Sequence, residues 1–146
     1  MMIDPAVLSF TVPGKPAAQG SKKLLGRVMV ESCKALPGWR SDVRTAAMAV
    51  RPYQWAKDPW MRVSFVAFFP RPKNHTVAGK GLVLKANAPA FPGRVGDTDK
   101  LARALLDSLT GVIWRDDDQV VHLYGQKLYA ALGEEARMEV IVEALG

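Results

Sequence analysis

Alternation of apolar with small or polar residues, and short runs of β-branched and aromatic residues, mark the strands that this chain is expected to form. The strongest is the run WMRVSFVAFF at 60–69, which Pro70 and Pro72 bring to an end. The other strands are expected at 6–12, 27–31, 119–130 and 136–144. The last two are predicted to pair with each other as antiparallel neighbours, because only a Gly-Glu-Glu loop joins them.

A helical period replaces this alternation in two places and predicts two helices. The first is expected to run from a capping Ser41 to about Val50. The second is expected over about 99–110, with Asp99 as its N-cap and leucines along one apolar side. Another side of this helix carries polar residues spaced four apart: Asp99, Arg103 and Asp107.

The predicted order is therefore β-(β)-α-β-loop-α-β-β, typical of an α+β domain whose small mixed sheet carries about two helices on one face. With 146 residues, 49% of them hydrophobic, the chain is expected to be a single domain over 1–146 with its own core. Residues 70–96 form a long loop rich in proline and glycine, and loops of this length are usually functional or disordered. This loop carries five basic residues: Arg71, Lys73, Lys80, Lys85 and Arg94.

The composition excludes several classes of protein and indicates the cellular compartment. One cysteine, Cys33, excludes an internal disulfide framework and a cysteine-rich zinc site. No run of about 18 apolar residues is present, so no membrane span or membrane partner is expected. The N-terminal MMIDPAVLSF lacks the basic start and long apolar core of an export signal. We therefore expect a cytoplasmic protein.

Charge is divided unevenly along the chain. The net charge is +6, yet residues 1–96 carry 15 Lys and Arg against four acidic residues, whereas residues 97–146 carry five against ten. Cations bind a phosphate backbone and carboxylates bind metal ions, so this division is typical of a nuclease. A solvated basic surface with acidic residues at helix ends and turns gives the same asymmetry, so charge alone leaves both interpretations open.

Two groups of aspartates are candidates for metal chemistry. Asp97 and Asp99 lie two residues apart at a loop–helix junction, where two carboxylates can converge on one Mg²⁺. Helix capping explains the same pair, since acidic residues favour a helix N-terminus. Residues 116–118 are three adjacent aspartates, and a turn accounts for one or two of them. Asp117 lies 18 residues after Asp99, and the helix with its return segment can bring the two back together.

Two basic residues follow these aspartates. Arg103, one helical turn after Asp99, could orient a carboxylate or stabilise the charge of a phosphoryl transition state. The alternative is an i, i+4 salt bridge, worth about 0.2–0.5 kcal/mol. Lys127, on the following strand, could act in the same way. Other chemistries lack their motifs, because there is no metal-ligand spacing of His or Cys, no nucleophile elbow and no Walker loop.

The stretch 96–127, GDTDKLARALLDSLTGVIWRDDDQVVHLYGQK, resembles the signature of the RusA family of Holliday junction resolvases. The shared elements, in order, are Asp-x-Asp, a basic residue, an Asp-Ser-Leu helix end, an apolar segment with an aromatic residue, Asp-Asp-x-Gln-Val and a downstream lysine. Upstream, Phe69-Pro70-Arg71-Pro72-Lys73 and the basic loop are similar to phage-borne members, so the resemblance implies a phage or prophage origin. It extends over about residues 6–144, with its specific motifs in 96–127.

This resemblance implies a RusA-like fold and a homodimeric, Mg²⁺-dependent endonuclease in a bacterial host cell, with Mn²⁺ as a substitute metal. Such an enzyme binds four-way junction DNA and nicks two opposing strands symmetrically. By motif position, the metal-binding aspartates fall on Asp97, Asp99 and Asp117, with Asp116 as a supporting neighbour. The family's catalytic lysine falls on Arg103, which keeps the charge but cannot transfer a proton, and its downstream lysine falls on Lys127. DNA contacts are expected from Lys22, Lys23, Arg71, Lys73, Lys80, Lys85, Arg94 and Lys100.

The mechanism expected from these residues is metal-assisted phosphodiester hydrolysis, with Arg103 and Lys127 neutralising the charge that develops on the phosphate. Two alternatives stay open. One is a non-catalytic branched-DNA-binding module with the same fold, whose acidic residues are structural. The other is a metal-dependent nuclease for a different branched substrate, such as a flap or a fork.

Overall fold

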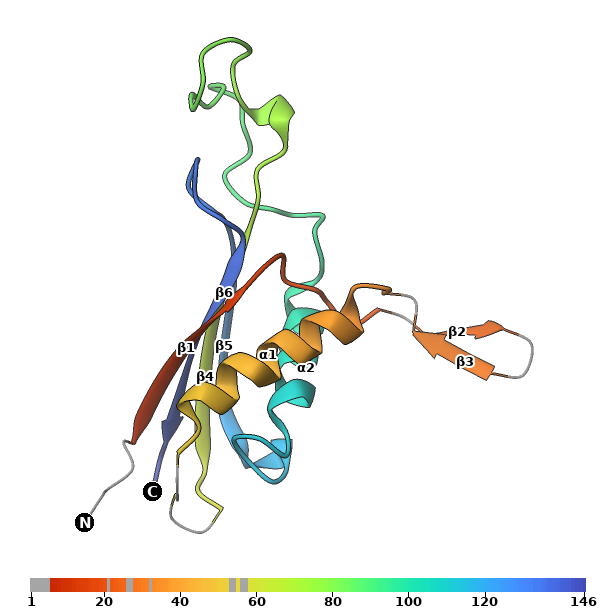
Figure 1. Ribbon diagram of the computed structural model, residues 1–146, viewed down its shortest axis with the longest axis vertical. Helices are drawn as coiled ribbons and strands as arrows, with labels where there is room; N and C mark the ends of the chain where they lie inside the picture. The colour runs from red at the N-terminus through yellow and green to blue at the C-terminus, as the bar shows by residue number, and fades with distance from the viewer. Residues whose placement is uncertain (1–5, 21, 26–27, 32, 53–54, 56–57) are drawn as a thin grey trace.

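The computed structural model describes residues 6–20, 22–25, 28–31, 33–52, 55 and 58–146. Four strands form one sheet in the order β1-β6-β4-β5: β1 (Val7–Pro13), β4 (Met61–Phe69), β5 (Val120–Tyr129) and β6 (Arg137–Ala144). Two short strands, β2 (Lys22–Leu25) and β3 (Val28–Glu31), form a separate antiparallel ribbon, which projects away from the sheet in Figure 1.

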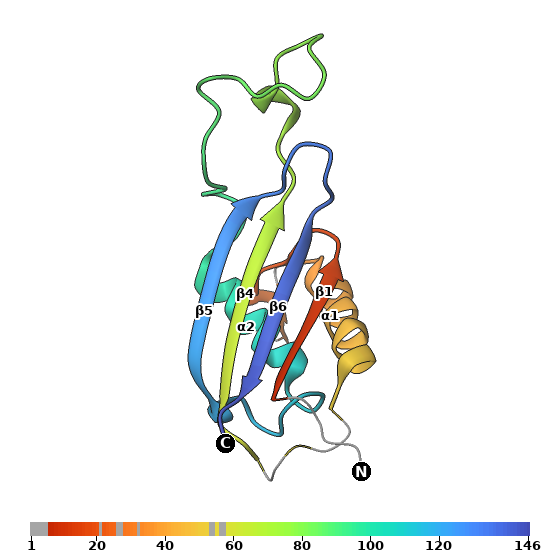
Figure 2. The same cartoon turned by 90° about the vertical axis from the view of Figure 1, so that its left-hand side faces the viewer.

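Both helices, α1 (Leu36–Val50) and α2 (Thr98–Leu109), cover the same face of the four-stranded sheet, as Figure 2 shows. This arrangement confirms the predicted α+β class with a mixed sheet and helices on one side. None of the helices in the described part of the chain is long and apolar enough to span a membrane.

The core lies between the helices and the sheet and follows the periodicities of the sequence. Every second residue of β4 is buried, from Met61 to Phe69, because these side chains face the helices. From α2, Leu101, Leu105 and Leu109 are fully buried against the same layer. Burial of this face therefore fixes α2 against the sheet, with its polar sides left toward solvent.

The prediction that the last two strands pair with each other as a hairpin is wrong. β4 lies between β5 and β6, pairing with β5 in parallel and with β6 antiparallel. The apolar β4 thus obtains a hydrogen-bonded partner on each side, the arrangement that buries it best. Gly125 makes the close β4–β5 pairing possible, because a Cβ at this residue would lie 2.5 Å from Cζ of Phe65.

Element boundaries differ from the predictions at three places. The first helix begins at Leu36 rather than Ser41, with Pro37 in its first turn, where a proline costs no hydrogen bond. The second helix has Asp97 rather than Asp99 as its N-cap. The ribbon strand β2 is not among the strands expected from the sequence.

Residues 70–96 are largely a loop, as predicted, with one 3₁₀ turn, η1 (Lys73–His75). The loop extends beyond the end of the sheet in both Figure 1 and Figure 2.

Candidate active site

The first pair of aspartates lies at the N-terminal end of α2. Asp97 is the N-cap, but its carboxylate makes no capping hydrogen bond and instead pairs with Nζ of Lys100 at 3.6 Å. Asp99 lies in the first turn, is exposed and has no side-chain partner among the described residues. Helix capping by a side chain therefore does not explain why the two carboxylates are here, although both still favour the helix dipole.

Lys127 holds the residues that lead into α2. Its Nζ donates to the carbonyl oxygens of Gly96 at 2.8 Å and Gly93 at 3.4 Å. Gly96 has φ +136°, and a Cβ there would lie 3.1 Å from Cβ of Ala18, so only glycine suits this backbone. Lys127 therefore fixes the peptide immediately before Asp97, a contact that sequence spacing could not reveal.

Arg103 lies one turn along α2 from Asp99 and is exposed. It forms no ion pair with any described residue, whereas Asp107 pairs with Nη2 of Arg40 in α1 at 3.8 Å. The alternative role for Arg103, an i, i+4 salt bridge within the helix, is thus not formed. Its guanidinium remains available to a ligand on the same side of α2 as Asp99.

The acidic triplet forms the 3₁₀ turn η2 (Asp117–Gln119), which leads into β5. The carboxylate of Asp116 accepts a hydrogen bond from the backbone N–H of Asp118 at 3.0 Å, so Asp116 caps this turn. Partial desolvation raises the pKa of Asp117, and the negative charges of Asp116 and Asp107 raise it further. Surplus negative charge therefore gathers around Asp117.

Gln119 anchors this turn to the sheet, a role that sequence reasoning missed. It is buried, and its Oε1 accepts from the backbone N–H groups of Arg115 and Asp116, each at 3.1 Å. Its Nε2 donates to the carbonyl of Pro59, just before β4, at 3.1 Å. The glutamine of the Asp-Asp-x-Gln motif was the available signal, since a buried amide must satisfy both its donor and its acceptor.

A metal site shared by Asp97, Asp99 and Asp117 stays a prediction. Within the described ranges, no group of three or more His, Cys, Asp or Glu side chains is close enough to hold a metal ion. Asp97 and Asp99 share the N-terminal end of α2. The residue of this helix whose negative charge raises the pKa of Asp117 is Asp107, nearer the C-terminal end. The donor chemistry still fits Mg²⁺, which commonly uses one or two carboxylates completed by waters and substrate phosphates.

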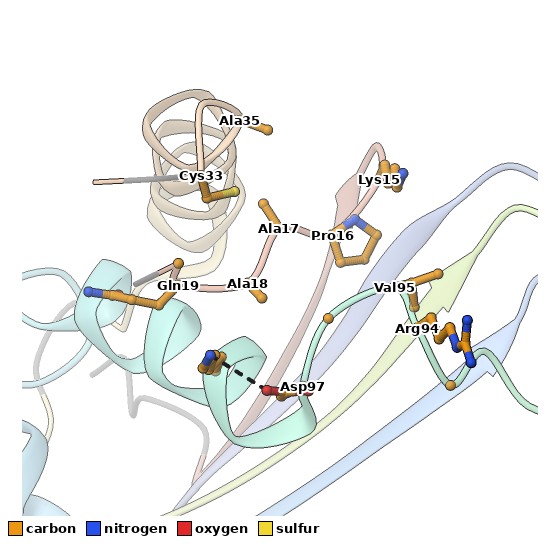
Figure 3. A pocket seen from close by; sticks show the side chains of 14 residues that line it. Lys15, Pro16, Ala17, Ala18, Gln19, Cys33, Ala35, Arg94, Val95 and Asp97 are labelled. Atoms are coloured by element: carbon orange, nitrogen blue, oxygen red, sulfur yellow. Dashed lines mark ion pairs between the residues drawn. The ribbon is translucent and has the colours of Figure 1, made fainter. Parts of the chain in front are cut away.

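A cavity of about 650 Å³ opens beside Asp97, a size typical of ligand pockets. Figure 3 shows the Asp97 carboxylate turned toward its ion-pair partner, with Pro16, Ala17 and Ala18 crossing the other side of the cavity. Among the described residues that line it are three cations: Lys15, Arg94 and Lys100. Positive side chains therefore surround an opening next to the first aspartate pair.

The other basic residues predicted to contact DNA differ in whether their side chains are exposed or already engaged within the protein. Lys73, Lys80, Lys85 and Arg94 are exposed on the long loop. Arg71 is already engaged, because its Nη1 donates to the carbonyl of Pro89 at 2.8 Å and its guanidinium stacks 4.2 Å from the ring centroid of Tyr129. The side chains of Lys22 and Lys23 lie outside the described residues.

Comparison with known proteins places this arrangement in a family. The family model for endodeoxyribonuclease RusA matches residues 13–143, a range that contains both helices, the acidic turn and Lys127. The chain is also 28% identical over 138 residues to the uncharacterized protein YqaN of Bacillus subtilis (strain 168), covering 92% of this chain and 94% of that protein. Because the family match extends over most of its length, the chain belongs to the RusA endodeoxyribonuclease family.

Proposed function

We propose that this protein is a Mg²⁺-dependent endonuclease that resolves four-way DNA junctions by paired symmetric nicks in the cytoplasm of a bacterial host. Family membership supports hydrolysis of DNA phosphodiester bonds. The observation that carries the proposal is that Asp99 and Arg103, one turn apart on α2, are exposed and unpaired within the described part of the chain. Charged side chains that form no ion pair within the fold are available to a substrate phosphate and its metal ion.

The proposed site divides its tasks among five residues. Asp97 and Asp99 would hold Mg²⁺, or Mn²⁺ in its place, together with the scissile phosphate, and Asp117, which lies apart from them in this structure, would join them when metal and DNA are bound. When bound, the metal supplies an activated water and polarises the phosphate. The guanidinium of Arg103 stabilises negative charge that develops on the phosphate oxygens. Lys127 keeps the peptide before Asp97 in place through its bond to Gly96.

We further propose that the enzyme acts as a homodimer, because a four-way junction offers two equivalent strands to a two-fold symmetric protein. The sheet face opposite the helices is uncovered in Figure 2 and carries exposed Val7, Tyr124 and Ile141. Tyr124 and Ile141 line one shallow groove on this face. Exposed apolar side chains on an open sheet face support packing against a second copy. Light scattering is expected to give twice the mass of one chain, and Ile141→Asp to give a single chain.

The proposed activity is tested on an immobile four-way junction labelled on each strand in turn, with and without Mg²⁺. We expect nicks at equal rates in two opposite strands, and only when the divalent ion is present. A flap and a linear duplex are assayed at the same salt concentration. Faster cleavage of the flap would favour the nuclease for other branched DNA. Junction binding without any nicking would favour the non-catalytic module, and either result contradicts the proposal.

Asp117 is expected to show a conflict between stability and metal binding. Its pKa is raised above 3.8, so its ionised form disfavours the folded state; this cost is absent below pH 3.8 and complete above the folded-state pKa. Asp117→Asn should therefore raise Tm slightly at pH 7 without metal. The same change should abolish most of the Tm increase that Mg²⁺ gives the wild type.

Thermal unfolding at pH 7, with and without Mg²⁺, measures both effects on Asp117→Asn. Asp118→Asn is the matched control, because Asp118 is an exposed neighbour in the same turn with no proposed metal contact. The control should keep the Mg²⁺-dependent increase in Tm. An Asp117→Asn protein that keeps it as well would remove Asp117 from the proposed ligands.

Lys127→Met is expected to lower nicking by roughly 10–100-fold, because supporting residues of metal ligands have effects of this size. The change removes the hydrogen bonds to Gly96 and Gly93, so Asp97 loses its fixed position. The Mg²⁺ concentration for half-maximal nicking should rise, and Lys127→Arg, which keeps donors and charge, should recover part of the activity. A lower Tm with unchanged Mg²⁺ dependence would show that Lys127 acts on stability alone.

A further inference from the structure

The tip of the long loop is a structured finger, which we define as residues 76–84. Its base is closed by an antiparallel bridge between Thr76 and Leu84. The backbone N–H of Val77 donates to the carbonyl of Val83 at 2.8 Å, and that of Lys85 donates to the carbonyl of His75 at 2.9 Å. The part of the loop that contains the finger extends beyond the sheet in both Figure 1 and Figure 2. The finger is therefore a formed projection rather than a featureless loop.

One edge of the finger is apolar and faces solvent. Leu82, Val83 and Leu84 are consecutive and are 68%, 46% and 41% exposed. Single exposed apolar residues are common on protein surfaces, but three in a row on a projecting segment expose surface that a binding partner would cover. The edge therefore indicates an interaction.

The charges around this edge identify the chemistry of the partner. Exposed Lys80 lies within the finger and exposed Lys73 and Lys85 lie on either side of it, and no acidic residue occurs anywhere between Asp58 and Asp97. A hollow of about 580 Å³ on the finger has Lys73 and Lys85 in its lining, while Leu82, Val83 and Leu84 lie outside it. Cations beside an apolar edge fit a phosphate backbone with bases next to it.

Polar and aromatic contacts tie the base of the finger to the end of the sheet. Arg71 bonds to the carbonyl of Pro89, contacts Nδ1 of His75 at 3.4 Å and stacks on Tyr129 at the end of β5. The His75 ring packs edge-on against the same tyrosine, with 5.4 Å between ring centroids. These contacts join the base of the finger to β5 of the sheet.

We propose that the apolar edge Leu82–Leu84 is a wedge that inserts between unstacked bases at the centre of branched DNA, while Lys73, Lys80 and Lys85 hold the adjoining phosphates. Apolar wedges of this kind unstack base steps in other DNA-binding proteins, and a branch point has bases that are already easier to separate. The inference rests on the proposed function, since it assumes that branched DNA is the substrate. It adds the residues that open the junction.

The test combines Leu82→Ser with Val83→Ser and places 2-aminopurine beside the branch point of an uncleavable junction. Wild-type protein is expected to raise the fluorescence of the unstacked base, and the double variant to lose most of this increase. Nicking of a cleavable junction should fall by about tenfold or more, while affinity for linear duplex stays unchanged. Met48→Ser, which changes a 61% exposed residue on α1, is the matched control and should behave as wild type.

The possible outcomes separate the wedge from the nuclease. If the double variant raises the fluorescence as much as wild type does, the wedge proposal is wrong and the nuclease proposal is unaffected. A wild type that neither binds nor nicks the junction overturns both. Circular dichroism checks that the double variant is folded. We expect it to fold, because both substituted side chains are exposed. A double variant whose only defect is loss of a dimer, seen by light scattering, shows a second copy to be the occupant and overturns the wedge.

Discussion

Replacing Asp99 by asparagine is expected to lower the rate of junction nicking by roughly 10²-fold or more, the scale found when one electrostatic group is removed from an active site. The amide keeps the size of the side chain but removes the negative charge proposed to hold Mg²⁺. Because Asp99 is exposed and unpaired among the described residues, the fold should lose no more than the helix-dipole contribution, about 0.3–1 kcal/mol. Single-turnover cleavage with saturating Mg²⁺, alongside thermal unfolding, measures both quantities.

The matched control for Asp99→Asn is Asp42→Asn, which removes an exposed carboxylate from α1 instead of α2. It has the same effect on net charge, so it should leave nicking close to the wild-type rate. Equal rates for Asp99→Asn and the control would contradict the assignment of the active site to the start of α2.

Junction affinity is expected to fall about 10³–10⁵-fold between roughly 50 and 200 mM salt, the loss found for proteins that neutralise about 6–10 phosphates. The exposed cations of the long loop and the cation-lined cavity beside Asp97 supply these contacts. Lys73→Gln combined with Lys85→Gln should reduce the slope of log K against log salt by about two. Fluorescence anisotropy on an uncleavable junction over a salt series measures both the affinity and this slope.

Arg62→Gln is the control for the salt series. Arg62 lies on the sheet and its Nη1 is paired with Oε2 of Glu143 at 2.7 Å, so its charge is already balanced. The slope should not change in this variant. A slope that the two lysine substitutions leave unaltered would show that the loop does not hold the phosphate backbone.

Local patterns were sufficient to predict most elements and the first part of the candidate site. The burial of Val63, Phe65 and Ala67 follows from period-two alternation, and α2 follows from its leucines. Asp99 and Arg103 share a side of α2 because residues four apart do so in any helix. Such predictions succeed because the geometry depends on the backbone of one element alone.

Contacts between distant segments were not predictable in this way. Lys127 bonds to Gly96, Gln119 bonds to the carbonyl of Pro59, and Arg71 stacks on Tyr129. In each pair a polar group finds its partner on another element, and the choice depends on how the sheet and the loop pack. The surroundings of Asp117 have the same origin: the charge of Asp107 raises its pKa, and which residue of α2 acts on the acidic turn depends on how the helix packs.

The amino-acid order of this chain was enough to establish an α+β domain, the apolar sides of its strands and helices, a basic loop and two groups of aspartates. It was not enough to establish that β4 lies between β5 and β6, or which carboxylates lie near each other. The reason is physical: periodicity is set within a few residues of backbone, whereas strand order and side-chain partners are set by which distant surfaces bury the most apolar area and satisfy the most polar groups together.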